Sequence, residues 1–319
     1  MSIRTARIET DLHGIARVCK ACEPSPNPVS IDQVRSWFQY NPPERISLRL
    51  VAVDENETVA GYSVIVHDVW TPAQHFYVWL GVDPADRCQG TGSALWEASL
   101  DFLQGQGATR LASEVLDHDP VGLAFAKRRG FSIDRHLFDS SLDLAVFDES
   151  PFLPAITALE AGGLRFCSLA DFPDTLERRR KFYELNFATV VDIPGEDWDY
   201  TAYPEFFEKR ILGAPWFRPE NQLLAVDGDT WVGLAAVMLT PETHSAYNAT
   251  TGVIRAYRRR KIAQALKVMA ARYARQHGAI QIRTDNDSRN APILAINGKM
   301  GYQPQPGKYG LVRWLGRIK

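Results

Sequence analysis

The chain of 319 residues contains two copies of one sequence pattern, and this repeat constrains the fold more than any other feature. Landmarks of the first copy recur at a constant interval of 171 residues, starting with Val82 and Val253. A register held over so many positions indicates a duplicated fold. The other pairs are Arg87 and Arg258, Gly92 and Ala263, Leu95 and Leu266, Gly107 and Gly278, Asp119 and Asn290, and Phe131 and Tyr302.

The length is sufficient for two cores, because single domains of globular proteins usually hold 100 to 200 residues. Hydrophobic residues make up 45% and charged residues 23%, which is ordinary for a globular protein. We expect an N-terminal domain at 1–145, a linker with a short helix at 146–162, and a C-terminal domain at 163–319. Prolines and a Gly-Gly stop mark the linker.

Charge and hydropathy exclude several classes of protein. The net charge of -2 argues against nucleic acid as the main partner, because such binding needs many uncompensated Lys and Arg. No signal segment and no apolar run of membrane-spanning length is present, so we expect no membrane partner and a cytoplasmic protein. The cysteine pair Cys19 and Cys22 lies in a helical pattern without a second pair, so we expect no metal site.

Each copy has the same expected order of elements. A hairpin with an acidic turn occupies 48–66 in the first copy and 223–239 in the second. A third strand, a glycine-rich or basic loop, a helix, a further strand, a second helix and a last strand follow, with the last strands at 136–144 and 309–315. The pattern predicts an α/β protein of the α+β type, with a mixed, mostly antiparallel sheet flanked by helices in each domain.

The loop that joins the third strand to its helix carries the chemistry. In the first copy Arg87, Gly90 and Gly92 spell R-x-x-G-x-G directly before the helix. Free amides and the dipole at a helix start suit a pyrophosphate, and glycines let phosphates approach the backbone. The spacing is neither a Rossmann fingerprint nor a Walker A loop, since no G-x-G-x-x-G and no Gly-Lys-Ser/Thr is present.

With this loop and a later N-x-x-A-type motif ending in Gly-Phe or Gly-Tyr, the sequence resembles the GNAT superfamily of acyl-CoA-dependent N-acetyltransferases. The arrangement resembles the tandem, mycothiol-synthase-like type with two GNAT domains. RCQGTG matches the loop of that family, and NAPILAINGKMGY matches its second motif at Asn290, Ile296, Asn297, Gly301 and Tyr302. The likeness covers roughly residues 48 to 143 and 222 to 315.

The resemblance implies that acetyl-CoA, as a co-substrate, lies between splayed strands in each copy. Its pantetheine would pair with the backbone at Val82 or Val253, and its pyrophosphate would lie on the amides of the loop. In the first copy the implied cofactor-binding residues are Val82, Arg87, Cys88, Gln89, Gly90, Thr91, Gly92, Ser93 and Asp119. In the second copy they are Val253, Arg258, Arg260, Lys261, Ala263, Asn290 and Asn297.

The second copy departs from the loop pattern at Lys261, which stands where the first copy has Gly90. We expect a side chain there to crowd the phosphates, although its charge and those of Arg258, Arg259 and Arg260 would attract them. A nucleic-acid or targeting patch is the alternative for this basic run, and the register of the repeat opposes it. The sequence therefore favours the first copy as the cofactor site.

The tyrosine that protonates the departing thiolate in the family falls at Ala126 in the first copy and at Asn297 in the second. A thiolate with a pKa of about 8.5 is a tolerable leaving group near neutral pH, so a missing acid slows the reaction without forbidding it. The candidate catalytic residues are Glu114 and His75 as bases, and Asn297 as a hydrogen-bond donor. For Glu114 a surface ion pair, and for His75 an edge-strand polar position, are the competing interpretations.

An additional segment in the second copy, 186–221, is rich in carboxylates and aromatic rings, with Asp192, Tyr203, Phe207 and Trp216 among them. Such a lid would suit a cationic amine, whereas ordinary packing of the rings on the domain core is the more common outcome. The resemblance implies an enzyme that moves acetyl from acetyl-CoA to the primary amine of a small molecule, acting as a monomer or homodimer. The alternative is a protein that binds acyl-CoA for regulation or structure without turnover in one or both domains.

Overall fold

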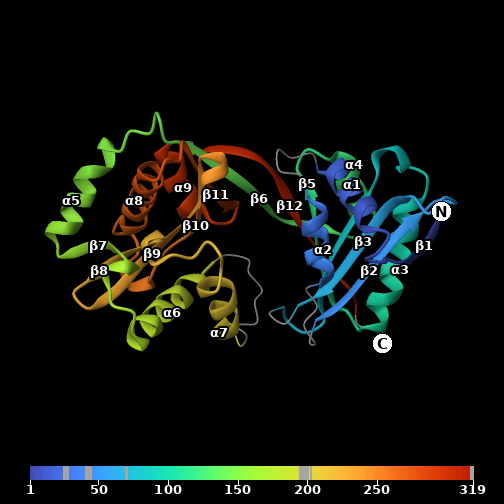
Figure 1. Cartoon of the computed structure of the whole chain (residues 1–319), viewed down its shortest axis with the longest axis horizontal. Coiled ribbons are helices and arrows are strands. Elements are labelled where there is room, and N and C mark those ends of the chain that lie inside the picture. Colours follow the sequence, from blue (N-terminus) through green and yellow to red (C-terminus); the bar gives the residue numbers. More distant parts are fainter. Residues whose placement is uncertain (24–28, 40–44, 69–70, 194–200, 202, 317–319) are drawn as a thin grey trace. The chain divides into compact units, whose positions relative to one another are not determined.

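The computed structural model describes residues 1–23, 29–39, 45–68, 71–193, 201 and 203–316 (Figure 1). The chain divides into two compact units. The first unit gathers Met1–Asp134 and Lys308–Lys319, and the second unit gathers Arg135–Glu196 and Tyr200–Gly307.

The first unit is built on five strands of its own N-terminal region and on the last strand of the chain. Strands β1 to β4 pair in order and antiparallel, β4 pairs with β5 in parallel, and β5 pairs antiparallel with β12. The strands are β1 (Ser2–Thr5), β2 (Ile46–Val53), β3 (Val59–His67), β4 (His75–Val82), β5 (Arg110–Leu116) and β12 (Gln303–Trp314); the helices are α1 (Leu12–Cys22), α2 (Ile31–Gln39), α3 (Thr91–Gly105) and α4 (Pro120–Arg128).

Helices cover both faces of these strands, in agreement with the continuous burial of Leu50 to Val53 in β2 and of Val59 to Gly61 in β3. On one face α1 and α2 bury Ile15, Val18 and Val34 against β2 and β3. On the other face α3 buries Leu95 and Trp96 against β2 to β5, together with Phe131. The cysteines of the C-x-x-C pattern lie in α1 as expected, and both are free thiols.

The second unit repeats this plan. Strands β7 to β10 pair in order and antiparallel, β10 pairs with β11 in parallel, and β11 pairs antiparallel with β6. The strands are β6 (Ser132–Asp143), β7 (Leu164–Ser168), β8 (Gln222–Asp227), β9 (Thr230–Thr240), β10 (Ser245–Val253) and β11 (Gln281–Asp287); the helices are α5 (Leu153–Ala161), α6 (Leu176–Val190), α7 (Tyr203–Phe206), α8 (Ile262–Gln276) and α9 (Ala291–Met300).

Figure 1 shows α6 and α7 on one side of the strands of the second unit and α8 and α9 on the other. The two faces have separate cores. Phe182, Tyr203 and Phe207 pack against β8 and β9 on the first side, whereas Leu266 and the alanines of α8 pack against β9, β10 and β11 on the second. Helix α5, which the sequence places in the linker, buries Ile156 and Leu159 in this second core.

The last strand of each sequence copy pairs within the other copy's unit. Residues Leu137–Asp143 of β6, which follow the first copy, pair with β11 of the second unit. Residues Lys308–Trp314 of β12, which follow the second copy, pair with β5 of the first unit. The sequence pattern indicated two last strands correctly, but the partner of a strand depends on contacts distant in sequence, which the local pattern does not contain.

The structure confirms the predicted fold class: mixed α/β units with mostly antiparallel sheets flanked by helices. Both hairpins form where the sequence places them, as β2–β3 and β8–β9. Within the described ranges, no helix combines the length and the hydropathy needed to span a bilayer. The same residues contain no group of three or more His, Cys, Asp or Glu side chains arranged to hold a metal ion.

Candidate functional site

The two parallel strands of each unit separate after a short paired stretch. In the first unit β4 and β5 pair only from His75 to Tyr77, opposite Arg110 to Ala112. In the second unit β10 and β11 pair only from Ser245 to Tyr247, opposite Gln281 to Arg283. Beyond these residues the two strands of each unit continue toward the loop and its helix, and the described residues form no further pairs between them. Each unit therefore has a splayed pair of strands that ends at a helix N-terminus.

The two loops have the same backbone conformation. Cys88 and Gly90 have φ values of 61° and 87°, and their counterparts Arg259 and Lys261 have φ values of 63° and 67°. Gly90 and Lys261 are the N-caps of α3 and α8, and no side chain caps either helix. Amides at such a helix start are available to an anion, and a backbone with alternating positive φ presents them as a concave nest.

Lys261 occupies the position of Gly90, and whether its side chain crowds bound phosphates stays a prediction. A Cβ built on Gly90 meets no protein atom within 4 Å, so a side chain at this position extends into open space. The left-handed backbone is uncommon for a lysine, and Lys261 nevertheless adopts it. Both loops therefore present the same arrangement of amides.

The arginine of each loop binds the end of the preceding strand. Arg87 Nε donates to the carbonyl oxygen of Val82 at 3.2 Å, and Arg258 Nε donates to that of Val253 at 2.9 Å. Arg87 also lies 3.9 Å from Asp119, which caps α4 by accepting from the Gly122 amide at 2.9 Å. Val82, Arg87 and Asp119, all predicted from the sequence, are thus brought together.

Asp192 binds Arg258, the arginine of the second loop. Its carboxylate forms ion pairs with both Arg255 and Arg258. Hydrogen bonds from these two guanidinium groups lower the pKa of Asp192 to about 2. The carboxylate that the sequence assigned to a lid for a cationic acceptor is therefore engaged with the protein's own arginines.

The first loop is covered by two residues of α4 and its end that sequence reasoning missed. Arg129 stacks on the ring of Phe125, with its guanidinium carbon 3.4 Å from the ring centroid, and donates to Ser93 Oγ at 2.8 Å. A Cβ built on Gly92 would lie 3.1 Å from Phe125 Cε2, so only a very small residue fits there. The hydroxyl of Thr91 is buried and has no hydrogen-bond partner among the described residues.

The strand before the second loop carries a β-bulge that its counterpart lacks. Strand β10 pairs with β9 up to Asn248, skips Ala249, and resumes at Thr250. Strand β4 pairs with β3 from Tyr77 to Val82 without a register shift. A bulge leaves one residue unpaired and is common next to active sites. It lies in β10 at the point where β10 and β11 separate.

Comparison with known proteins agrees with this geometry. The family model described as Acetyltransferase (GNAT) family matches residues 13–131 and 161–302. The chain belongs to the GNAT family. A mycothiol acetyltransferase from Brachybacterium faecium is 31% identical over 182 residues, which make up 56% of this chain and 46% of that protein. The match therefore spans about half of the length of this relative.

Two solved structures share the fold along the whole chain. A tandem GNAT protein from the clavulanic acid biosynthesis pathway aligns over 100% of this chain and 99% of its own, with 21% identity and a TM-score of 0.70. A GCN5-related N-acetyltransferase from Sphaerobacter thermophilus aligns over 98% and 95%, with 18% identity and a TM-score of 0.69. These comparisons establish the tandem GNAT arrangement that the sequence indicated.

The GNAT motif positions of α9 lie in a buried polar region. Asn297 donates from Nδ2 to Asn286 Oδ1 of β11 at 2.7 Å, while its own Oδ1 is buried without a partner among the described residues. Asn290 is the N-cap of α9 and makes no side-chain cap bond, in contrast to Asp119 of the first unit. Both asparagines occupy the predicted positions, and their roles toward a ligand stay predictions.

The candidate bases of the first unit lie on the face of α1 and α2. Glu114 is half-exposed and lies 3.7 Å from Lys308 Nζ, which also pairs with Glu23 at 3.0 Å. The ring of His75 packs edge-on against Trp314 at 5.9 Å between centroids. The structure thus shows a surface ion pair and an aromatic contact at these positions, and their catalytic roles stay predictions.

Asp285 is a functional candidate that sequence reasoning missed. It lies on β11 at the position equivalent to Glu114 on β5, one interval of the repeat further along. The carboxylate is exposed and hydrogen-bonds Tyr247 of β10, and this contact and burial together raise the pKa of Tyr247. The repeat was the available signal, because a carboxylate stands at this strand position in both copies.

Of the aromatic residues in the expected lid, some are buried, Phe206 and Trp216 are partly buried, and others lie outside the described residues. Tyr203 and Phe207 are each 1% exposed and pack with Phe182, and the Tyr203 hydroxyl donates to Asn186. This is the packing alternative of the sequence analysis. The segment 194–200, with Glu196, Asp197, Trp198, Asp199 and Tyr200, lies outside the described residues.

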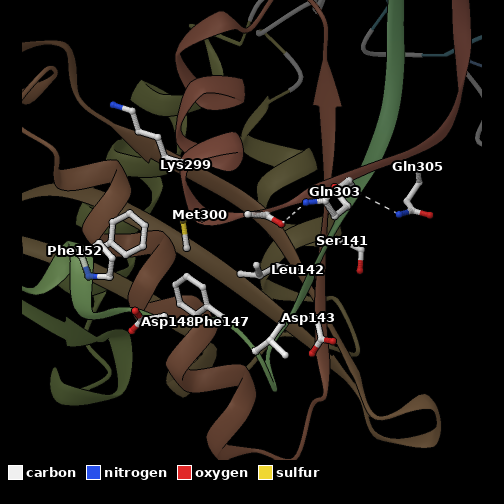
Figure 2. Close-up of a pocket in the computed structure, with 13 residues that line it drawn as sticks. Ser141, Leu142, Asp143, Phe147, Asp148, Phe152, Lys299, Met300, Gln303 and Gln305 are labelled. Atoms are coloured by element: carbon white, nitrogen blue, oxygen red, sulfur yellow. Dashed lines mark hydrogen bonds between the residues drawn. The ribbon is translucent and has the colours of Figure 1, made fainter.

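A cavity of about 410 Å³ lies elsewhere in the second unit (Figure 2). Leu142, Phe147, Phe152 and Met300 form its apolar part. Gly301 of the second motif lines it, but none of the predicted cofactor-binding or catalytic residues does. The geometry therefore assigns no acyl-CoA binding to this cavity.

Proposed function

We propose that this protein transfers an acetyl group from acetyl-CoA to the primary amine of a small molecule, by direct attack in a ternary complex in the cytoplasm. One observation carries the proposal: each unit joins a splayed pair of strands to an uncapped helix start behind a loop with two positive φ values. The amides at 89–93 or 260–264 would hold the pyrophosphate, and the splay would admit the pantetheine.

The residues of both units fit this substrate. Gly92 and its counterpart Ala263 are small, so phosphates can approach the helix start. The buried hydroxyl of Thr91, which has no hydrogen-bond partner within the described part of the chain, lies at the first residue of α3. In the second loop Lys261 adds charge from an open position.

The bulge at Ala249 favours the second unit for the chemical step. Its unpaired backbone lies at the origin of the splay, where a backbone N–H can stabilise the negative oxygen that develops on the thioester carbonyl. Asp285, on the other face of β11 and beside Tyr247, is a carboxylate that can take the proton of the attacking amine. In the first unit Glu114 is the corresponding base, and His75 is another candidate. In the second unit Asn297 would orient the substrate.

A specific observation favours a different role for the first unit. Its strand β4 has no bulge, and its splay is lined by the apolar Trp96, Val78 and Phe131. We propose as the alternative that this unit holds acyl-CoA for structure or regulation without turnover.

Matched loop variants test the proposal. Gly90→Val with Gly92→Val alters the first loop, and Lys261→Val with Ala263→Val places the same residues at the same positions of the second. Acetyl-CoA should raise the melting temperature of the wild type, and each double variant should lose part of that increase. Gly107→Asn, in an open turn of positive φ at the other end of α3, is the control.

Turnover is measured as CoA release with a panel of primary amines. The proposal expects release in the wild type and its loss in the second-loop variant. Full thermal stabilisation in both loop variants, or no release with any amine despite stabilisation, would contradict the enzymatic function.

A further inference from the structure

Three positions beside the separating parallel strands hold apolar residues in the first unit and polar residues in the second. In the first unit Trp96 of α3 packs edge-on against Phe131, with centroids 5.7 Å apart, in a core that includes Val78. In the second unit the equivalent residues are Lys267 of α8, Tyr302 and Asn248. Asn248 corresponds to Val78 because each follows the tyrosine that ends the paired stretch, Tyr247 or Tyr77.

The amine of Lys267 is deeply buried at this place. Lys267 is 1% exposed, and its Nζ donates to Asn248 Oδ1 at 2.9 Å and lies 4.9 Å from the centroid of the Tyr302 ring. Asn248 is the last residue before the bulge. The amine therefore lies beside the point where β10 and β11 separate, on the face covered by α8 and α9.

A connected polar network surrounds the amine. Thr284 Oγ1 donates to the Asn248 carbonyl oxygen at 3.1 Å, and Asn286 Nδ2 donates to the Thr284 carbonyl oxygen at 3.3 Å. Asn297 joins the network through Asn286. Two atoms of this region, Asn297 Oδ1 and the Tyr302 hydroxyl, are buried without a hydrogen-bond partner among the described residues.

Such unpaired atoms are costly in a protein interior and commonly mark a place where a ligand completes the hydrogen bonding. Lys267 could instead serve only to anchor Asn248 in the core. An apolar core would be the less costly way to fill the space, as the first unit shows with Trp96 and Phe131. The polar set is therefore expected to contribute to the reaction.

We propose that the ammonium group of Lys267 protonates the departing CoA thiolate in the second unit. The proposal rests on the proposed function, because it needs a thioester in the splay of β10 and β11. It assigns the acid role to a residue of α8, in a chain whose motif tyrosine is replaced by Asn297.

The step is balanced in atoms and electrons. The C–S bond of the tetrahedral adduct breaks, its electron pair moves to sulfur, and Nζ of Lys267 gives sulfur a proton. The products are the acetylated amine, the CoA thiol and a neutral lysine. The proton that the attacking nitrogen loses passes to Asp285 and from there to solvent, and solvent restores the ammonium group of Lys267 before the next turnover.

Burial lowers the pKa of Lys267 to about 7, so the ammonium group is a stronger acid than a thiol with a pKa of about 8.5. The groups that face the amine are Asn248 of β10 and the titratable Tyr302, whose pKa burial raises. Thr284 and Asn286 of β11 are uncharged, and β9 contributes Ala235 and Val237 to this core. Among the described residues no carboxylate contributes to the shift of Lys267.

The test compares the wild type with Lys267→Met and with Lys267→Met combined with Asn248→Val. The double variant removes both polar partners and gives this place in the second unit the apolar character that the first unit has. Neither partner is left buried without the other, so the double variant should fold even if the single variant does not. Using the best amine of the panel, we expect kcat to fall about 100-fold in both variants, while the thermal stabilisation by acetyl-CoA persists.

The pH profile separates an acid from a structural lysine. An acid must be protonated, so kcat of the wild type should decline as pH rises through about 7, and this decline should be absent in the variants. Folded variants that keep kcat within threefold, or that keep the decline, overturn the proposal.

A second measurement does not need turnover. The ultraviolet absorbance of the thiolate reports the pKa of bound CoA, and Lys267 should lower that pKa in the wild type relative to the double variant. An unchanged thiol pKa contradicts the role of Lys267. A wild type that shows the shift in thiol pKa but acetylates no amine would instead contradict the proposed function.

Discussion

Single residues of the two loops differ more than the backbone that carries them. Gly90 and Lys261 occupy the same left-handed position, and Arg87 and Arg258 bind the same strand-end carbonyl. The sequence predicted these positions because the repeat keeps their spacing. It could not predict that Lys261 adopts the left-handed backbone of its glycine counterpart, because a lysine rarely has a positive φ.

At the residue scale, Asp192 should contribute stability that depends on pH. Its pKa is lowered in the folded state, so the contribution is full above the unfolded value near 4 and disappears as pH falls toward 2. Because the side chains of Arg255 and Arg258 are 78% and 40% exposed, solvent screens the ion pairs, and we expect a contribution of about 1 kcal/mol to the free energy of unfolding. Denaturant unfolding of Asp192→Asn and wild type measures it.

The expected result is a difference near pH 6 that vanishes at pH 2. Asp174→Asn is the matched control, since Asp174 pairs with Arg178 and Arg179 away from the loop. A difference between Asp192→Asn and wild type that is constant over this range would show that the ion pairs with the loop do not stabilise the fold.

Strands β4 and β10 occupy equivalent positions in the two copies, but they pair differently with their neighbouring strands. The bulge inserts Ala249 into β10 and shifts the equivalence of the two copies by one residue before that point. The pattern of alternating apolar residues predicted both strands. It did not reveal the bulge, because a single additional residue changes the pairing and not the composition.

At the element scale, deletion of Ala249 should make the β10 ladder continuous like that of β4. The fold should persist, since the first unit shows that the uninterrupted pairing is compatible with this architecture. Loss of an oxyanion donor typically reduces kcat by about 100-fold or more. CoA release measures the effect, and thermal stabilisation by acetyl-CoA should remain.

Strand β4 has no residue equivalent to Ala249, so deletion of Val78, the counterpart of Asn248, serves to report the cost of shortening an uninterrupted strand. Should the Ala249 deletion retain wild-type kcat, the bulge would have no role in stabilising the oxyanion.

At the scale of the molecule, the pairing of the last strand of each copy determines which residues make up each unit. Residues Lys308–Trp314 complete the first unit on β5, and Leu137–Asp143 complete the second unit on β11. The repeat gave the number and order of the elements, whereas the pairing is set by contacts between residues distant in the sequence. The boundaries 1–145, 146–162 and 163–319 stay a prediction.

At the scale of the molecule, a fragment of residues 1–145 lacks β12 and leaves the edge of β5 unpaired. We expect it to aggregate or to remain partly unfolded, because an open edge in a sheet is a template for association. A fragment in which a short Gly/Ser linker joins residues 1–134 to 308–319 contains the missing strand and should fold. Circular dichroism and gel filtration distinguish the two.

Cooperative folding of 1–145 as a monomer would show that β12 is dispensable, and would support the boundaries drawn from the sequence. Failure of both fragments would indicate that the first unit needs the remainder of the chain for more than one strand.

The place of β12 also has a consequence for synthesis on the ribosome. The strand that completes the first unit is synthesised after all the strands of the second unit, so the N-terminal half must wait, with the edge of β5 open, until β12 has emerged. During that interval the nascent chain is exposed to association with other chains. A translation stop before β12 would therefore damage the half of the protein that was made first.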